Sequence, residues 1–166
     1  PNFILFAMFC IHYINRSIIF PMKMAGGAPA PLSIVLLAVV YCTWNGFNQS
    51  TQLMLVHQYP VSWLRDPRFI VGTILFFSGF YINLQSDQIL FDLKKRGTSV
   101  DGARKYGIPM GGMFTYVTAA NYFGEILEWT GFAIACWSLP AFAFAWWTFA
   151  NLAPRAMQVR IVKEYA

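Results

Sequence analysis

Polar side chains occur at helical spacing inside two otherwise apolar segments of the chain. In residues 121–129, Asn121, Glu125 and Glu128 (i, i+4, i+7) would project from one helix face. Asn83 and Asp87 repeat the i, i+4 spacing at the end of another apolar segment. An unpaired charge in hydrocarbon costs about 2.5–3.5 kcal/mol or more, so such groups need a polar partner. The two faces indicate a polar ligand held at a membrane boundary.

Simpler structural roles exist for each of these groups. Hydrogen bonds between membrane helices could explain Asn121 and one carboxylate, although two carboxylates exceed what such bonding requires. Asn83 and Asp87 could cap a helix end near the interface, or they could bind ribose hydroxyls or an amide. Trp129, next to Glu128, offers a flat apolar wall for a rigid ring system.

Tyr13 and Arg16 form a further candidate pair in the first apolar segment. They share a helix face, and a phenol near a positive charge is a good hydrogen-bond donor to a carbonyl that gains electron density. Interfacial packing is the alternative for Tyr13, and His12 is expected to be structural. The basic run 94–96 could be a solvated cytoplasmic flank or a phosphate site, where Lys acts as a point charge and Arg as a bidentate fork.

The composition is that of a membrane protein. Hydrophobic residues make up 57% and charged residues 11% of 166 positions, with a mean hydropathy of +0.48, whereas soluble domains carry about 25% charge. Apart from Arg16, the Lys and Arg residues behind the net charge of +5 sit outside the apolar segments, which favours positive-inside topology over nucleic-acid binding. Cys10, Cys42 and Cys136 lie far apart in apolar segments and are expected to be core residues.

Five hydrophobic stretches predict an all-α, polytopic membrane helical bundle that forms one domain, 1–166. They cover residues 1–20, 32–47, 69–90, 114–137 and 140–152. Since a spanning helix needs roughly 20 residues, the first, third and fourth fit well and the second is marginal. The fifth spans only if it extends through Pro154 or pairs tightly with the fourth. The last two stretches place the loop 92–110 and the basic tail on one side, which the positive-inside rule makes cytoplasmic.

Familiar cofactor and nucleophile motifs are absent from the sequence. It contains no GxGxxG fingerprint, Walker A loop, HExxH, zinc-spaced His/Cys cluster or GxSxG. An enzyme of this kind is expected to bind no metal and to hold a soluble cofactor with polar side chains from its helices.

Longer motifs run through nearly the whole chain. They are His12-Tyr13 with Arg16, CTWNG at 42–46, DPRF at 66–69, IN, SD and IL within 82–90, IPMGG at 108–112, FTYVTAANYFGEILEW at 114–129, WSLPA at 137–141 and Arg155-Ala156. Together these highly specific motifs resemble the steroid 5-alpha-reductase (3-oxo-5-alpha-steroid 4-dehydrogenase) family. The chain looks like the C-terminal two-thirds of a seven-helix fold, and the N-terminal helices are expected to be missing from it.

The resemblance implies a membrane enzyme of the endoplasmic reticulum, or of the inner membrane in a bacterium, whose cofactor site faces the cytoplasm. It implies hydride transfer from NADPH to the 4,5 double bond of a 3-oxo-4-ene steroid. In the family, a Tyr at the position of Tyr13 hydrogen-bonds the 3-ketone, assisted by a Glu from an earlier helix. The cofactor-binding residues so implied are Asn83, Asp87, Lys94, Tyr106, Asn121, Glu125 and Arg155. The substrate-binding residues so implied, beside Tyr13, are Tyr41, Trp129 and Trp147.

The sequence departs from the family pattern at several positions. Gln85 replaces a frequent His, Leu37 falls where some members have Arg, and Lys94 stands where Arg is common. The tail after Arg155 is short and lacks a His-rich segment. Alternatives of similar helical design are a reductase for enoyl thioesters or polyprenols and an S-adenosylmethionine-dependent membrane methyltransferase, and a non-catalytic sterol-binding protein is a different class again. The natural steroid and the oligomeric state stay open at this point.

Overall fold

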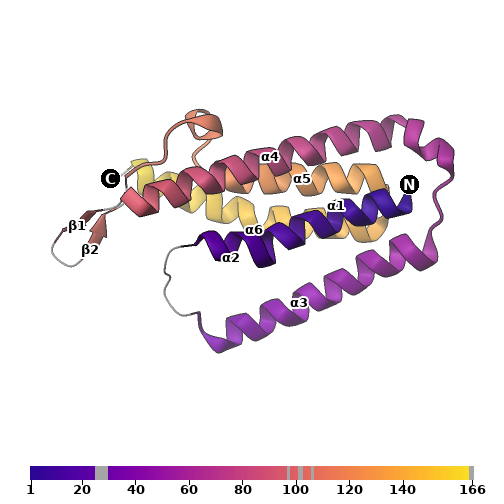
Figure 1. Ribbon diagram of the computed structural model, residues 1–166, viewed down its shortest axis with the longest axis horizontal. Helices are drawn as coiled ribbons and strands as arrows, with labels where there is room; N and C mark the ends of the chain where they lie inside the picture. The colour runs from indigo at the N-terminus through magenta and orange to yellow at the C-terminus, as the bar shows by residue number, and fades with distance from the viewer. Residues whose placement is uncertain (25–29, 97, 101–102, 106, 165–166) are drawn as a thin grey trace.

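Long helices occupy the hydrophobic stretches in the computed structural model (Figure 1). The structure describes residues 1–24, 30–96, 98–100, 103–105 and 107–164, with side chains described for all of these except 96–105 and 160–164. The elements in chain order are α1 (Asn2–Ile14), η1 (Asn15–Ile19), α2 (Phe20–Lys23), α3 (Leu32–Thr51), η2 (Gln52–Val56), η3 (Val61–Arg65), α4 (Pro67–Arg96), β1 (Thr98–Val100), β2 (Ala103–Lys105), η4 (Gly112–Thr115), α5 (Ala120–Cys136) and α6 (Leu139–Glu164). The prediction of a helical bundle is confirmed, with a short antiparallel hairpin of β1 and β2 added to it.

Most helices extend beyond the stretches that predict them. The first stretch forms α1, η1 and α2 without a break, and the second continues from α3 through the π-helical η2. The fifth does run through Pro154, which lies inside α6, although a helical proline removes one backbone hydrogen bond. The fourth is shorter than predicted, because the 3₁₀ turn η4 begins at Gly112, where Gly111 and Gly112 both have positive φ, and α5 begins only at Ala120.

Two helical segments of the described chain are long and apolar enough to cross a bilayer. They are Asn2–Lys23, with 22 residues and a mean hydropathy of 1.7, and Pro67–Lys95, with 29 residues and a mean hydropathy of 1.4. Large apolar side chains are also exposed elsewhere, among them Leu37 at 71% and Trp146 at 70%. Such an exterior suits lipid contact better than water. These features fit a membrane protein, while five separate crossings stay a prediction.

The helices lie roughly along one axis (Figure 1). The helices α4 and α5 are antiparallel neighbours, α6 packs against α5, and α1 crosses the same group, while α3 diverges from the bundle towards its N-terminal end (Figure 1). The hairpin and the end of α6 lie at the same end of the bundle, and the α3–α4 and α5–α6 connections lie at the other. This arrangement agrees with the prediction that the basic loop and the tail share one side.

Glycines permit the close approach of α4 and α5. Gly72 and Gly79 on α4 face Gly131 and Gly124 on α5. A Cβ added at Gly72 would lie 2.6 Å from the Gly131 carbonyl oxygen, and one at Gly79 would lie 2.6 Å from the Gly124 carbonyl oxygen. Only a residue without a side chain allows the two backbones to touch in this way. The contact aligns the polar faces that follow Gly79 and precede Gly131.

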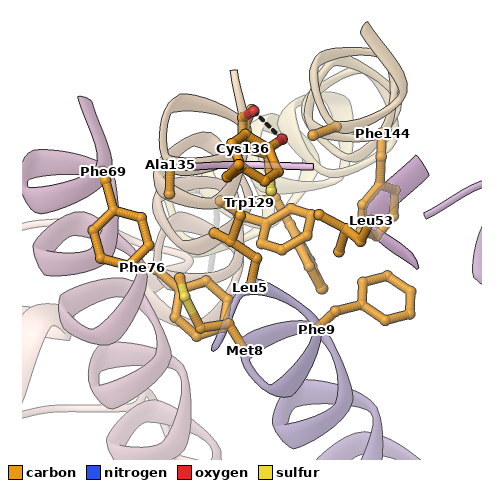
Figure 2. Packing of buried hydrophobic residues seen from close by; sticks show 14 residues of the cluster. Leu5, Met8, Phe9, Leu53, Phe69, Phe76, Trp129, Ala135, Cys136 and Phe144 are labelled. Atoms are coloured by element: carbon orange, nitrogen blue, oxygen red, sulfur yellow. Dashed lines mark hydrogen bonds between the residues drawn. The ribbon is translucent and has the colours of Figure 1, made fainter. Parts of the chain in front are cut away.

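The hydrophobic core lies where α1, α4, α5 and α6 meet (Figure 2). Its main side chains are Leu5, Met8 and Phe9 from α1, Phe69 and Phe76 from α4, Trp129 and Phe132 from α5, Phe144 from α6 and Leu53 from η2. The three cysteines are unpaired, with Cys136 buried and Cys42 exposed. The prediction of core cysteines therefore holds for Cys136 and is wrong for Cys42, because the outward face of α3 carries it.

Candidate active site

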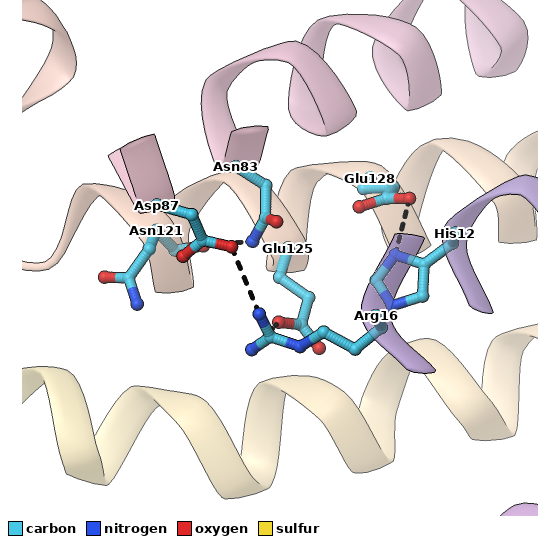
Figure 3. Close-up of polar contacts among 7 residues, drawn as sticks. All are labelled: His12, Arg16, Asn83, Asp87, Asn121, Glu125 and Glu128. Carbon is cyan, nitrogen blue, oxygen red and sulfur yellow. Dashed lines mark hydrogen bonds and ion pairs between the residues drawn. The ribbon is translucent and has the colours of Figure 1, made fainter. Parts of the chain in front are cut away.

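Arg16 brings together the carboxylates of two other helices (Figure 3). Its Nη1 donates to Asp87 Oδ2 at 3.2 Å, and its Nη2 donates to Glu125 Oε2 at 3.4 Å. The Asp87 and Glu125 side chains are 7% and 16% exposed, and that of Arg16 is 32% exposed. We call Arg16, Asp87 and Glu125 the carboxylate clamp. One cation facing two carboxylates leaves a formal charge of −1 if both are ionised, and desolvation makes that charge a strong attractor for hydrogen-bond donors.

Asn83 lies one turn before Asp87 on the same face of α4. Its Nδ2 donates to the Asn121 backbone carbonyl at 3.0 Å, which ties α4 to the first turn of α5. Its Oδ1 is buried and has no hydrogen-bond partner among the described residues. A buried acceptor without a donor is costly, so this oxygen marks a place where a ligand donor would be stabilising.

His12 and Glu128 form a second, deeper polar pair. His12 Nδ1 lies 2.8 Å from Glu128 Oε1, and the two residues are 3% and 0% exposed. Glu128 Oε2 has no hydrogen-bond partner within the described part of the chain. Figure 3 shows the pair one helical turn from the carboxylate clamp, with His12 and Arg16 reaching from the same helix towards α5.

Tyr13 points towards α3. Its hydroxyl accepts a hydrogen bond from Asn45 Nδ2 at 3.2 Å. Gln49 Nε2 in turn donates to Asn45 Oδ1 at 3.4 Å and to the Pro140 carbonyl oxygen at 2.9 Å. The sequence predicted Arg16 as the charged neighbour of this phenol. In the structure, the guanidinium group is engaged by Asp87 and Glu125, because two buried carboxylates attract it more strongly than a neutral hydroxyl does.

A cleft of about 360 Å³ separates α3 from the first turns of α6. Most of its lining is apolar, and Tyr41 and Trp147 stack across it with ring centroids 5.2 Å apart at 24°. Asn45 and Gln49 form its polar wall. Since Asn45 also donates to the Tyr13 hydroxyl, only this one side chain separates the cleft from the phenol.

Trp129 lies in the core. It is 1% exposed, with its ring 4.5 Å from that of His12 and 4.3 Å from that of Phe144. Its ring is 6.2 Å from that of Tyr13, so it supports the phenol from behind. This geometry differs from the predicted open wall for a ligand, because α1 and α6 cover both sides of the indole.

The sequence matches known proteins along most of its length. A profile of the family described as 3-oxo-5-alpha-steroid 4-dehydrogenase matches residues 28–164. The chain belongs to this family. It is 48% identical over 158 residues to 3-oxo-5-alpha-steroid 4-dehydrogenase 1 of Bos taurus, which covers 95% of this chain and 60% of that protein.

Human relatives in the 3-oxo-5-alpha-steroid 4-dehydrogenase family give a similar picture. Enzyme 1 of Homo sapiens is 48% identical over 158 residues, covering 95% of this chain and 59% of its own length. Enzyme 2 of Homo sapiens is 42% identical over 156 residues, covering 94% and 59%. The chain therefore spans about three fifths of the relatives it matches. The predicted resemblance is confirmed at the level of the family.

Several predicted site residues of this family member are brought together, and others lie apart. Asn83, Asp87, Glu125 and the Asn121 backbone form one cluster, whereas the Asn121 side chain makes no hydrogen bond to any of the described residues. Lys94 is on α4 about 10 Å beyond Asp87, since a helix rises about 1.5 Å per residue. Arg155 is exposed on α6, and Tyr106 lies outside the described residues.

The buried contact of His12 with Glu128 fits the structural role expected for it, whereas sequence reasoning missed the partners of Arg16 and the roles of Asn45 and Gln49. For Arg16 a signal was present, because it is the only Arg or Lys within the five hydrophobic stretches and buried carboxylates require a cation. Asn45 and Gln49 repeat the same i, i+4 polar spacing as Asn83 and Asp87. Neither spacing identifies the partner on another helix, since the bonds from Asn45 to Tyr13 and from Asn83 to the Asn121 carbonyl join residues far apart in the chain.

Proposed function

We propose that the protein is a membrane-embedded reductase that transfers hydride from NADPH to the 4,5 double bond of 3-oxo-4-ene steroids. The observation that carries the proposal is the position of Tyr13. Its hydroxyl is hydrogen-bonded to Asn45, which lines the apolar cleft. Arg16, one turn further along the same helical segment, forms the carboxylate clamp with Asp87 and Glu125. A phenol between an apolar cleft and a polar cluster suits a flat ketone on one side and a dinucleotide on the other. Family membership supports the same reaction.

The donors and acceptors of the polar cluster fit a nicotinamide dinucleotide. Asp87 and Glu125 supply oxygens that accept hydrogen bonds from ribose hydroxyls. Asn83 Oδ1, buried and without a partner among the described residues, would accept from an amide or hydroxyl. Arg16 reduces the repulsion that two carboxylates would otherwise exert on an anionic ligand. Lys94, Tyr106, the Asn121 side chain and Arg155 are assigned to the same cofactor, with the two cations near its phosphates.

In the proposed chemistry, negative charge develops on the ketone oxygen of the substrate, next to Tyr13. When bound, a reduced nicotinamide supplies the hydride, which adds to the ring carbon beta to the ketone. Tyr13 donates a hydrogen bond to the ketone oxygen and stabilises the enolate charge as it forms. A proton then completes the adjacent carbon. Tyr41 and Trp147 line the cleft and pack against the steroid rings, while Trp129 holds the phenol in place from the core.

The proposed topology uses all five hydrophobic stretches as crossings. The loop 92–110 and the end of α6 then face the cytoplasm, together with the cofactor site. In a eukaryote the membrane is that of the endoplasmic reticulum, and in a bacterium it is the inner membrane. The apolar exterior of α3 and α6 supports contact with lipid along these helices.

The proposal is tested with purified protein in lipid nanodiscs. The protein is mixed with NADPH and either testosterone or progesterone, and loss of the enone absorbance is followed together with NADPH oxidation. Equal loss of enone and NADPH supports the reductase. NADPH oxidation driven by an enoyl thioester or a polyprenol, without enone loss, would transfer the assignment to a related reductase.

Cofactor titration separates the remaining classes. Isothermal titration with NADPH, NADH and S-adenosylmethionine is expected to give the tightest binding with NADPH. Preferential binding of S-adenosylmethionine would indicate a methyltransferase. Binding of a steroid without binding of any of the three cofactors would indicate a sterol-binding protein instead.

A further inference from the structure

The hydrogen bonds between Tyr13 and α6 have a fixed direction. The Pro140 carbonyl at the end of the series only accepts, so Gln49 must turn its NH₂ group towards it. The same NH₂ group also donates to Asn45, which must accept with Oδ1. Asn45 therefore turns its own NH₂ group towards Tyr13. The orientation of both amides thus follows from an acceptor that cannot change its role.

This direction determines what the Tyr13 hydroxyl can do. Its oxygen accepts from Asn45, so its hydrogen cannot point at Asn45 and is available for another acceptor. Asn45 is the hydroxyl's one hydrogen-bond partner in the described part of the chain. Asn45 and Gln49 are 6% and 2% exposed, which keeps water from competing for either amide.

We propose that Asn45 and Gln49 are positioning residues that hold the Tyr13 hydroxyl as a hydrogen-bond donor to the ketone of the substrate. The inference rests on the proposed function and assigns a role to side chains of the cleft wall. Donation from Asn45 also withdraws electron density from the phenolic oxygen, which strengthens the bond that Tyr13 makes to a developing enolate. Reversal of the series would turn the phenolic hydrogen towards Asn45 Oδ1, where it is no longer free to reach the ketone of the substrate.

A purely structural tie between α3, α1 and α6 would not depend on this direction. Helices are held together equally well whichever group donates, provided that each polar atom has a partner. A positioning role depends on the direction, and it acts only through the Tyr13 hydroxyl. These two properties separate the explanations.

Gln49→Glu tests the direction with little change in shape. A carboxylate at this position cannot donate to Pro140, and a protonated carboxyl would donate to Pro140 while presenting its carbonyl oxygen to Asn45. In both cases Asn45 is driven to offer its oxygen to Tyr13. Asn45→Leu removes the donor altogether. Asn151→Leu is the matched control, because within the described residues the Asn151 amide donates to the Trp147 carbonyl of its own helix, at 2.8 Å, and to no other group.

Steady-state reduction of a 3-oxo-4-ene steroid is measured for each variant in nanodiscs. Gln49→Glu and Asn45→Leu are expected to lower kcat about 10-fold, the effect of one net hydrogen bond, while the steroid KM changes less than about 3-fold. In a Tyr13→Phe background, the same substitutions are expected to change kcat less than about 2-fold, because the group through which they act is gone. Equal effects in both backgrounds would indicate a structural role and overturn the inference.

Infrared spectroscopy gives a readout that needs no turnover. A 3-oxo-4-ene steroid labelled with ¹³C at carbon 3 is bound without NADPH, and its carbonyl stretch is recorded. The frequency is expected to be lower in the wild type than in Tyr13→Phe, with Gln49→Glu close to Tyr13→Phe. If the wild type reduces the enone and Gln49→Glu has the same kcat and the same carbonyl frequency as the wild type, the inference is overturned while the proposed function stands. A wild type that reduces no enone would overturn the proposed function instead.

Discussion

Replacement of Gly79 by Ala is expected to separate the two helices that carry most of the polar cluster. The added Cβ would lie 2.6 Å from the Gly124 carbonyl oxygen and closer still to the Glu128 backbone nitrogen. Ordinary van der Waals contact begins at 3.4 Å. Because both obstacles are backbone atoms, no side-chain rotation can relieve the overlap, and α4 must move away from α5 by about 1 Å.

The cost follows from the contacts that this movement changes. Overpacking of a tight interface costs about 1–3 kcal/mol. The bond between Asn83 and the Asn121 carbonyl, 3.0 Å long, would be stretched beyond its useful range, with the loss of about 0.5–1.5 kcal/mol. The expected total is a loss of about 1.5–4.5 kcal/mol of unfolding free energy. The same movement spreads Asp87 from Glu125, so NADPH affinity is expected to fall by about 10-fold or more.

Gly46→Ala is the control for this substitution. Gly46 lies inside α3, and a Cβ there would meet nothing within 4 Å. Alanine at this position is expected to be neutral or to stabilise by about 0.4–1 kcal/mol, since it restricts the unfolded chain and favours helix. Reversible unfolding in mixed micelles and NADPH titration measure both variants. If Gly79→Ala unfolded like the wild type and bound NADPH normally, the argument that α4 and α5 touch through their backbones would be refuted.

Four other substitutions or treatments test separate parts of the site and its topology. Tyr13→Phe is expected to lower kcat about 10²–10³-fold with little change in NADPH affinity, because the phenol acts mainly on developing charge; wild-type turnover would exclude the assigned role. Glu125→Ala is expected to weaken NADPH binding in titration, and unchanged affinity would count against that contact. In sealed vesicles of known orientation, protease is expected to cut the loop 92–110 only from the cytoplasmic face, whereas cutting from the opposite face would reverse the topology. The Arg68 guanidinium and backbone N–H lower the pKa of Asp66 from 3.8 to about 2. The contribution of the ionised Asp66 to stability is therefore complete above about pH 4 and is lost as the pH falls towards 2. Asp66→Asn is expected to remove this pH dependence from the measured free energy of unfolding between about pH 4 and 2.

The parts of the structure that depend on local spacing could be predicted from the sequence. Asn83 and Asp87 do share a face of α4, and Glu125 does lie opposite them on α5, because helical periodicity fixes which side chains project together. The helices themselves follow from long apolar stretches. The start of α5 was misplaced since apolar composition continues through 114–119, where a 3₁₀ turn and a loop replace the helix.

The partners of these side chains could not be predicted in the same way. Arg16 reaches residues 71 and 109 positions away, and Asn45 reaches Tyr13 across 32 positions. Such pairs depend on how the helices pack against one another, and Gly79 and Gly124 set that distance only between α4 and α5, through the absence of a side chain. A pattern read along one helix indicates that a polar face exists, but the distance between two helices is set by both of them.

The distribution of charge explains why α1 controls both halves of the site. Arg16, on η1 directly after α1, supplies the cation that faces Asp87 on α4 and Glu125 on α5, and His12 on α1 adds a hydrogen bond with Glu128. These contacts hold the continuous segment of α1 and η1 in one rotational setting, with Tyr13 turned towards α3. Replacement of Arg16 by a neutral residue would release that setting and move the phenol together with the clamp. Asn45→Leu and Gln49→Glu leave the ion pairs of Arg16 in place and act on the hydrogen bonding of the Tyr13 hydroxyl. The two sets of substitutions are therefore expected to affect stability differently while both lower turnover.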